Sequence, residues 1–137
     1  MSEQTLVFIK PDGVKRQIVG EIIARFEKRG LEIKALQHIQ MTESFCQAHY
    51  HEHVDKPFYP RLKDYMLSGP VVAFVLQAEN VVSIVRQMVG VTNAAEAEAG
   101  TIRGDFAHSL AHNVIHASDS TSSAKAEISR FFPNLSV

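Results

Sequence analysis

Short apolar runs along the chain alternate with segments whose apolar residues recur at helical spacing. The run "TLVFIK" at 5–10 is rich in β-branched and aromatic residues and leads into "PDG", so it predicts a buried strand that ends in a turn. Over 19–26 the apolar residues have the i, i+3, i+4, i+7 spacing of an amphipathic helix, and Gly30 stands where such a helix would end. The run 31–41 alternates apolar and polar residues, as in a half-buried strand. Its apolar face would carry Leu31, Ile33, Ala35, Ile39 and Met41.

The middle of the chain continues this pattern. Thr42 can cap a helix that runs through Tyr50, and a second short helix is expected over 60–67, before "SGP". The apolar run 70–77 predicts a central strand.

The last third begins with another segment of helical spacing, 81–89, for which Asn80 is the expected N-cap. Residues 90–104 then form a long loop of small residues, and long loops inside compact domains are usually functional or disordered. A short strand at 113–117 follows. A final helix, with apolar residues at 124, 128 and 131, ends before Pro133.

The predicted order is a strand followed by a helix, repeated through the chain. The strands and helices do not form the evenly long units of a doubly wound sheet. We therefore expect an α+β fold of the ferredoxin-like type, with a four-stranded antiparallel sheet and helices packed on one face. No internal repeat or linker interrupts the pattern, so residues 1–137 are expected to form a single domain.

Composition narrows the function classes. The single cysteine, Cys46, excludes an internal disulfide and fits a reducing compartment. The net charge of −1 gives no reason to expect binding to nucleic acid or to an anionic membrane surface. No apolar run is long enough to span a bilayer, and the N-terminus has no signal-peptide pattern. We therefore expect a cytoplasmic protein that binds any anion at a local site.

The stretch "NVIHASDS" at 113–120 places His116 at the end of a short strand, before small residues and one acid. A lone histidine there is more often a buried hydrogen-bonding residue than a reactive one. Glu127 lies outside the apolar stripe of the last helix, so it could face either solvent or the edge of the sheet. Near His116, its carboxylate would orient the imidazole and stabilise its cation.

Three cations could form a local anion site. Lys10 ends the first strand, Arg86 lies on a helix, and Arg103 lies in the long loop region beside Gly104. A guanidinium can bind phosphate oxygens two at a time. Taken alone, however, Lys10 fits a lysine that extends to solvent from a tight turn, and each arginine is more often a solvated surface charge.

A metal site is the competing interpretation. His108, His112 and His116 are spaced i, i+4, i+8 and would share one face of a continuous helix. The intervening "NVI" is strand-like, which disfavours such a helix. The alternating histidines of "HYHEH" at 49–53 would scatter around a helix. The hypothesis predicts stoichiometric zinc or nickel.

Several motifs occur together in one order: "KPDGV", "KPFYPRL", "SGPV", "GVTNA", "GTIRGDF", "NVIHASDS" and "SAKAEISRFF". In this order they resemble the nucleoside diphosphate kinase family, from about residue 4 to residue 132. The resemblance implies transfer of the terminal phosphate from a nucleoside triphosphate, mainly ATP, to nucleoside diphosphates. It implies a ping-pong route through a phosphohistidine, broad base specificity and a role in balancing nucleotide pools. It also implies a homo-oligomer, either a tetramer or a hexamer.

The resemblance assigns catalytic roles residue by residue. His116 would be phosphorylated, with Ser118 and Glu127 supporting its ring and Tyr50 beside it. Lys10 and Asn113 would meet the ribose hydroxyls, and Lys10 the phosphates as well.

Nucleotide-binding roles follow in the same way. The phosphates would be held by Arg86, Thr92 and Arg103. The base would stack on Phe58, with Leu110 on its other side and Leu62 nearby. Mg²⁺ would bridge phosphate oxygens and would not sit in a cage of protein ligands.

A few positions depart from the family pattern. Ala94 and Ala99 stand where prolines are usual, in a loop that the resemblance implies contributes to subunit contacts. His112 replaces a frequent arginine. Ala117 replaces a frequent glycine and would be strained if that site needs a positive φ. The sequence ends at Val137, so we expect it to lack any subunit contact that a longer tail would make.

A noncatalytic nucleotide-sensing module on the same fold is a second hypothesis. It would keep Phe58 and the arginines but would not need a nucleophile. The presence of His116 favours the enzyme.

Overall fold

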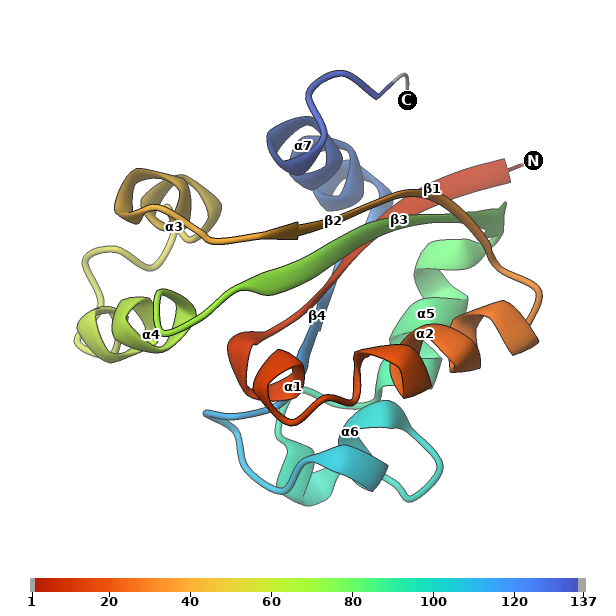
Figure 1. The fold of residues 1–137 in the computed structure, drawn as a ribbon, viewed down its shortest axis with the longest axis horizontal. Helices are drawn as coiled ribbons and strands as arrows, with labels where there is room; N and C mark the ends of the chain where they lie inside the picture. The colour runs from red at the N-terminus through yellow and green to blue at the C-terminus, as the bar shows by residue number, and fades with distance from the viewer. Residues whose placement is uncertain (1, 136–137) are drawn as a thin grey trace.

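The structure, a computed structural model, describes residues 2–135 and is built on an antiparallel sheet of four strands in the order β2-β3-β1-β4 (Figure 1). The expected α+β, ferredoxin-like fold class is confirmed. The strands are β1 (Ser2–Ile9), β2 (Glu32–Ile39), β3 (Val71–Glu79) and β4 (Ile115–Ala117). The helices are α1 (Pro11–Lys15), α2 (Val19–Lys28), α3 (Glu43–His49), α4 (Tyr59–Met66), α5 (Val81–Val89), the 3₁₀-helix η1 (Ala94–Glu96), α6 (Ile102–Phe106) and α7 (Thr121–Phe131). Val137, on which the expectation about a short tail rests, lies outside the described residues.

Helices cover both faces of the sheet, and the expectation of one covered face is wrong. Figure 1 shows α2 and α5 on one side of the strands and α7 on the other. Val7 and Ile9 of β1 pack into the core with α2 and α5, whereas Leu6 and Phe8 pack into a second core with α3, α4 and α7. A strand buried on both faces reads as a continuous apolar run, as "LVFI" does.

Strand β2 contains a bulge that divides its apolar residues between the two cores. The register with β3 shifts between Ile33 and Ala35, so the side chains after the shift turn to the other face. Leu31 and Ile33 pack into the α2 and α5 core, whereas Ala35, Ile39 and Met41 pack into the other. The prediction that all five share one face is therefore wrong, because an alternating sequence does not reveal an inserted residue.

The helix ends follow the expected capping at two positions and depart from it at a third. The Thr42 hydroxyl accepts a hydrogen bond from the Phe45 amide, so the predicted cap of α3 is confirmed. Gly30 follows α2 with a φ of +91°. Asn80 precedes α5, but it adopts a left-handed conformation (φ 57°) and its side chain makes no capping hydrogen bond.

Three short helices were not expected. The turn after the first strand is α1, and the long loop 90–104 contains η1 and the start of α6. Gly104 lets this segment fold back on itself, because a Cβ there would lie 1.9 Å from the carbonyl oxygen of Glu98. The loop is thus tightly packed, and it carries Arg103 on a helix.

The loop geometry is compatible with the two missing prolines. Ala94 is the first residue of η1 and follows an extended Asn93 (φ −80°, ψ 104°), the backbone that a proline requires before it. Ala99 precedes Gly100, which has a φ of +96°, in a turn closed by a hydrogen bond from the Thr101 amide to the Glu98 carbonyl. Proline is favoured at the first central position of such a turn.

Ala94→Pro and Ala99→Pro are therefore each expected to stabilise the fold by ~0.4–1 kcal/mol, because proline restricts the unfolded chain. Calorimetry should show a thermal midpoint raised by a few degrees. Gly100→Ala is the control and should lower the midpoint, since its φ is left-handed. A double proline variant whose midpoint is unchanged or lower would contradict this account.

Candidate active site

His116 opens onto a cavity of about 500 Å³ whose walls come from segments far apart in the sequence. Eight of the residues singled out in the sequence line it together: Lys10, Tyr50, Arg86, Thr92, Arg103, Asn113, His116 and Glu127. Ser118 lies fully buried behind them and contacts Glu127. The fold therefore assembles most of the expected site.

Strand pairing fixes the plane of the His116 ring. β4 pairs with β1 so that His116 lies opposite Phe8. The two rings stack with centroids 4.7 Å apart and an interplanar angle of 17°. Phe8 is itself completely buried, so one face of the imidazole lies against a rigid aromatic surface.

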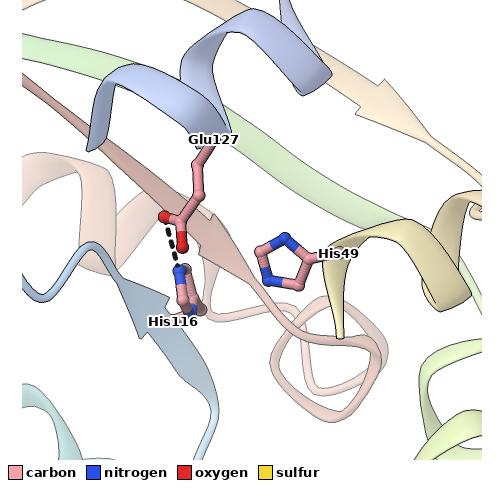
Figure 2. Close-up of side chains that lie close together, drawn as sticks. All are labelled: His49, His116 and Glu127. Carbon is pink, nitrogen blue, oxygen red and sulfur yellow. Dashed lines mark hydrogen bonds and ion pairs between the residues drawn. The ribbon is translucent and has the colours of Figure 1, made fainter. Parts of the chain in front are cut away.

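Glu127 approaches the edge of the same ring from α7, which answers the question its position left open. Its Oε1 lies 2.9 Å from Nε2 of His116 (Figure 2). The Ser118 hydroxyl donates to the same oxygen at 2.7 Å. Burial alone would raise the pKa of Glu127, but the hydrogen bonds from His116 and Ser118 hold that pKa below its ordinary value.

The contact with Glu127 sets the tautomer of His116. An ionised carboxylate only accepts hydrogen bonds, so the proton between the two groups belongs to Nε2. In a neutral imidazole the other nitrogen, Nδ1, then carries the lone pair. Nδ1 has no hydrogen-bond partner among residues 2–135. The ring therefore offers Nδ1 as a nucleophile or a ligand.

A half-buried lysine and a buried arginine line the cavity. Lys10 Nζ donates to Oδ1 of Asn113 at 2.7 Å, and burial, reinforced by the charge of Arg103, lowers its pKa to about 8. The Arg103 guanidinium donates to the carbonyls of Ile115 (2.6 Å) and Gly90 (3.0 Å). Burial and the nearby Arg86 lower the pKa of Arg103 to about 10, so both groups stay charged at neutral pH. Neither forms an ion pair with a carboxylate in the described part of the chain, which is typical of a site for an external anion.

Arg86 differs from these two cations because it is already paired. Its Nη1 lies 3.0 Å from Oδ1 of Asp119 at the rim of the cavity and 3.3 Å from the carbonyl of Ala117. The guanidinium therefore faces the cavity from α5 with part of its charge balanced.

A strained turn delivers Asn113 and His116 to the cavity. Val114 has a φ of +73°, which is rare for a β-branched residue, and its carbonyl accepts the Lys10 amide at 2.7 Å. Asn113 Nδ2 donates to the Thr92 carbonyl at 2.9 Å. Ala117 lies in β4 and is not among the described residues with a positive φ, so alanine is unstrained there. The strain lies three residues earlier than the sequence suggested.

Three residues expected to hold a base do not line this cavity. Phe58 is 51% exposed and Leu110 is 60% exposed. Leu62 packs instead against the core that contains Met66. Their expected contacts with a base remain predictions.

The three histidines proposed as metal ligands on one helix do not lie on a common helix. α6 ends at Phe106, and His116 lies in β4, so His108, His112 and His116 do not share a helix face. The His112 ring instead packs on Tyr65, with centroids 4.7 Å apart.

Two further residues line the cavity: Arg130, which sequence reasoning did not name, and His49, which it considered only as one of the alternating histidines at 49–53. The His49 ring stands edge-on to His116, with centroids 5.0 Å apart (Figure 2). Arg130 Nη1 lies 3.1 Å from Nδ1 of His49. Burial, with the nearby charge of His116, lowers the pKa of His49 to about 3. No local sequence pattern predicts this contact, because it depends on how α3 and α7 pack on the same face of the sheet.

The comparisons with known proteins agree with this geometry. The family model described as nucleoside diphosphate kinase matches residues 3–137. This chain belongs to the nucleoside diphosphate kinase family. It therefore is an enzyme that transfers phosphate between nucleotides, and the resemblance found in the sequence is confirmed.

Individual members of the nucleoside diphosphate kinase family resemble the chain over nearly its whole length. Nucleoside diphosphate kinase 1 of Pisum sativum is 50% identical over 133 residues, which cover 97% of this chain and 89% of that protein. The nucleoside diphosphate kinase of Methanocorpusculum labreanum is 55% identical over 130 residues, covering 95% and 87%. The halophilic enzyme of Halobacterium salinarum, solved in complex with CDP, superposes with a TM-score of 0.95 at 40% identity, covering 98% and 90%. Among the described residues of this chain, no helix is long and apolar enough to cross a membrane.

The neutral His49 ring is expected to make the free energy of unfolding decrease as the pH falls. Its pKa is about 3 in the folded protein and 6.5 ordinarily, so between these values the unfolded chain binds a proton that the folded protein excludes. The contribution of the neutral ring is complete above pH 6.5 and is lost as the pH falls toward 3. His49→Gln, which cannot titrate, should flatten this dependence by up to ~1.4 kcal/mol per pH unit. Urea unfolding of both proteins from neutral pH down to about pH 4 measures the slope, and parallel curves would refute the assignment.

Proposed function

We propose that this cavity carries a ping-pong transfer of the terminal phosphate of a nucleoside triphosphate, mainly ATP, to nucleoside diphosphates through phosphorylated His116. The observation that carries the proposal is the hydrogen bond between Nε2 of His116 and Glu127. It leaves the lone pair of the imidazole on Nδ1, in a cavity lined by cations. Nδ1 would attack the terminal phosphorus, forming an N–P bond as the P–O bond to the diphosphate breaks. The terminal oxygen of a second diphosphate would then attack phosphorus, and the N–P bond would break.

The surrounding charges suit both half-reactions. A neutral imidazole is a good nucleophile near neutral pH and a good phosphoryl leaving group. When Nδ1 bonds to phosphorus the ring becomes cationic, and the carboxylate of Glu127 stabilises that charge through the Nε2 proton. Lys10, Arg86 and Arg103 would stabilise the negative charge spread over the transferred phosphoryl group.

Mg²⁺ would reach this site with the nucleotide. Of the three carboxylates in the described lining, Glu127 is engaged by His116 and Ser118, and Asp119 is paired with Arg86. Only Glu52 is left, and a single carboxylate is not a cage of oxygen ligands. The donor set therefore fits an ion carried by the phosphates better than a resident one. When bound there, Mg²⁺ would supply further neutralisation of phosphate charge.

We propose that the base binds outside the cavity, between Phe58 and Leu110. Both side chains are large, apolar and more than half exposed, which leaves surface for a planar ring. Lys10 and Asn113, already hydrogen-bonded to each other, would meet the ribose. A base held by stacking on an aromatic face is recognised by shape, so broad base specificity follows.

We also propose that the chain acts as a homo-oligomer, a tetramer or a hexamer, in the cytoplasm, where it would balance nucleotide pools. Leu36 on the edge strand β2 and Val91 in the long loop are 51% and 54% exposed, which supports apolar contacts between copies. Light scattering at micromolar protein tests the assembly, and a monomer would refute it.

His116 is expected to become labelled when the protein is incubated with ATP carrying ³²P at the γ position. His116→Asn should abolish both labelling and transfer, because the nucleophile is lost while the fold remains. His108→Asn, the same change at an exposed histidine outside the cavity lining, should label normally. If the His116 variant still forms an acid-labile phosphoprotein, another residue is the nucleophile.

The enzyme is expected to accept GDP, ADP, CDP, UDP and dTDP, because no side chain is assigned to read a base edge. Stacking should favour purines by ~1–3 kcal/mol without excluding pyrimidines. Steady-state kcat/KM with ATP as donor and each diphosphate as acceptor measures this range. A preference above ~10⁴-fold for one base would require a buried hydrogen-bond reader and would contradict the stacking account.

A further inference from the structure

We infer that His49 is a further phosphoryl-binding residue, whose Nε2–H donates a hydrogen bond to the phosphoryl group on His116 while Arg130 holds its ring in the required tautomer. The inference rests on the proposed function, since it concerns the phosphorylated form of the same site. It gives a role to a histidine that the sequence analysis assigned to no site.

The contact with Arg130 determines where the proton of His49 resides. A guanidinium donates hydrogen bonds and accepts none, so Nδ1 of His49, 3.1 Å from Arg130 Nη1, must present a lone pair. The ring is then neutral with its proton on Nε2. Partial burial lowers the pKa of His49, which agrees with a neutral ring.

The free ring nitrogen of His49 lies on the side of His116, the residue on which the phosphoryl group would form (Figure 2). In Figure 2 one ring nitrogen of His49 lies on the side of α7 and the other on the side of His116. A ring nitrogen of each histidine and a carboxylate oxygen of Glu127 all lie within 4.8 Å of one another. Nε2 of His49 has no hydrogen-bond partner within residues 2–135, although the ring lines the cavity. An unpaired donor beside the nucleophile fits an incoming anion.

Tyr50, the next residue, strengthens this reading. Its hydroxyl is buried and has no hydrogen-bond partner in the described structure. Burial raises the pKa of Tyr50 above its ordinary value, so the hydroxyl stays a donor. The end of α3 thus presents two unpaired donors to the cavity that Lys10 and Arg103 also line.

The same three residues, His49, His116 and Glu127, could also be read as a metal site. Two observations weigh against a cation. Arg130 already donates to Nδ1 of His49, and His116 already donates to Glu127, so coordination would have to break both hydrogen bonds. Lys10, Arg86, Arg103 and Arg130 also line the cavity, and four cations favour an anion over a metal ion.

A matched pair of variants separates hydrogen bonding from packing. His49→Phe keeps a flat ring against Phe8 and His116 but has no donor, whereas His49→Gln loses the ring but keeps an N–H near the Nε2 position. Single-turnover phosphorylation by γ-³²P-ATP in a rapid-quench apparatus gives the rate of the chemical step. Equilibrium binding of ADP reports ground-state affinity. His108→Phe, the same change at an exposed histidine outside the cavity lining, is the control.

In His49→Phe, His116 should become phosphorylated about tenfold to a hundredfold more slowly than in wild type. This is the usual effect of losing a hydrogen bond to a charged group. ADP binding should be unchanged, and His49→Gln should recover most of the rate. Far-UV circular dichroism checks that each variant is folded. If His49→Phe does not fold, the slower rate expected for Arg130→Leu takes its place. ¹⁵N NMR should show the Nε2–H tautomer of His49 in wild type and a mixture in Arg130→Leu.

The outcomes separate this inference from the proposed function. If wild type takes no label, both fail. If wild type is labelled and His49→Phe matches it, or His49→Gln is as slow as His49→Phe, only the inference is overturned. An Nδ1–H tautomer of His49 in wild type would overturn it as well. Equal phosphorylation rates, together with one equivalent of zinc bound tightly by wild type and not by His49→Phe, would assign the histidine to a metal instead.

Discussion

The hydrogen bond between Nε2 of His116 and Oε1 of Glu127 is the interaction on which the site depends. It decides which ring nitrogen is free, and it places a negative charge where the ring becomes positive on phosphorylation. Several elements of the fold hold it in place. β4 must pair with β1 to stack His116 on Phe8, α7 must lie over the sheet to bring Glu127, and Ser118 must fix the carboxylate. The short strand β4 and the helix after it are therefore one functional unit.

The same site contains features that oppose stability. Arg103 is a buried cation and Lys10 a half-buried one, His49 is a half-buried imidazole, and Val114 has a left-handed backbone. Each is unfavourable in a folded protein that binds no anion. The sheet tolerates them because β1 and β3 are packed on both faces by helices, so the strands that support the site cannot shift. An anion in the cavity would relieve part of this charge repulsion, which couples binding to stability.

The sequence predicted the fold class and most of the cavity because these depend on patterns that are local. Strand runs, helical spacing and the order of motifs led to the antiparallel sheet, to the family and to His116 with its cations. Other features depend on how distant segments meet. The bulge near Lys34 reverses the faces of β2 within an unbroken alternation, and the His49 contact exists only when α3 and α7 pack on the same side.

Glu127 could not be placed from its helix alone, since position 127 lies at the margin of the apolar stripe. The backbone strain lies at Val114 and not at Ala117, where the sequence suggested it, because a change of residue type does not reveal a backbone dihedral angle.

A single atom, Nδ1 of His116, is the proposed nucleophile. The most direct test is to identify which ring nitrogen carries the phosphate after incubation with ATP. Two-dimensional ¹H–¹⁵N NMR of the intact phosphorylated protein distinguishes the two isomers of phosphohistidine and retains the Glu127 contact. The account predicts a phosphate on Nδ1, with the proton still on Nε2. A phosphate on Nε2 would mean that the hydrogen bond to Glu127 breaks before transfer and would contradict the central role given to it here.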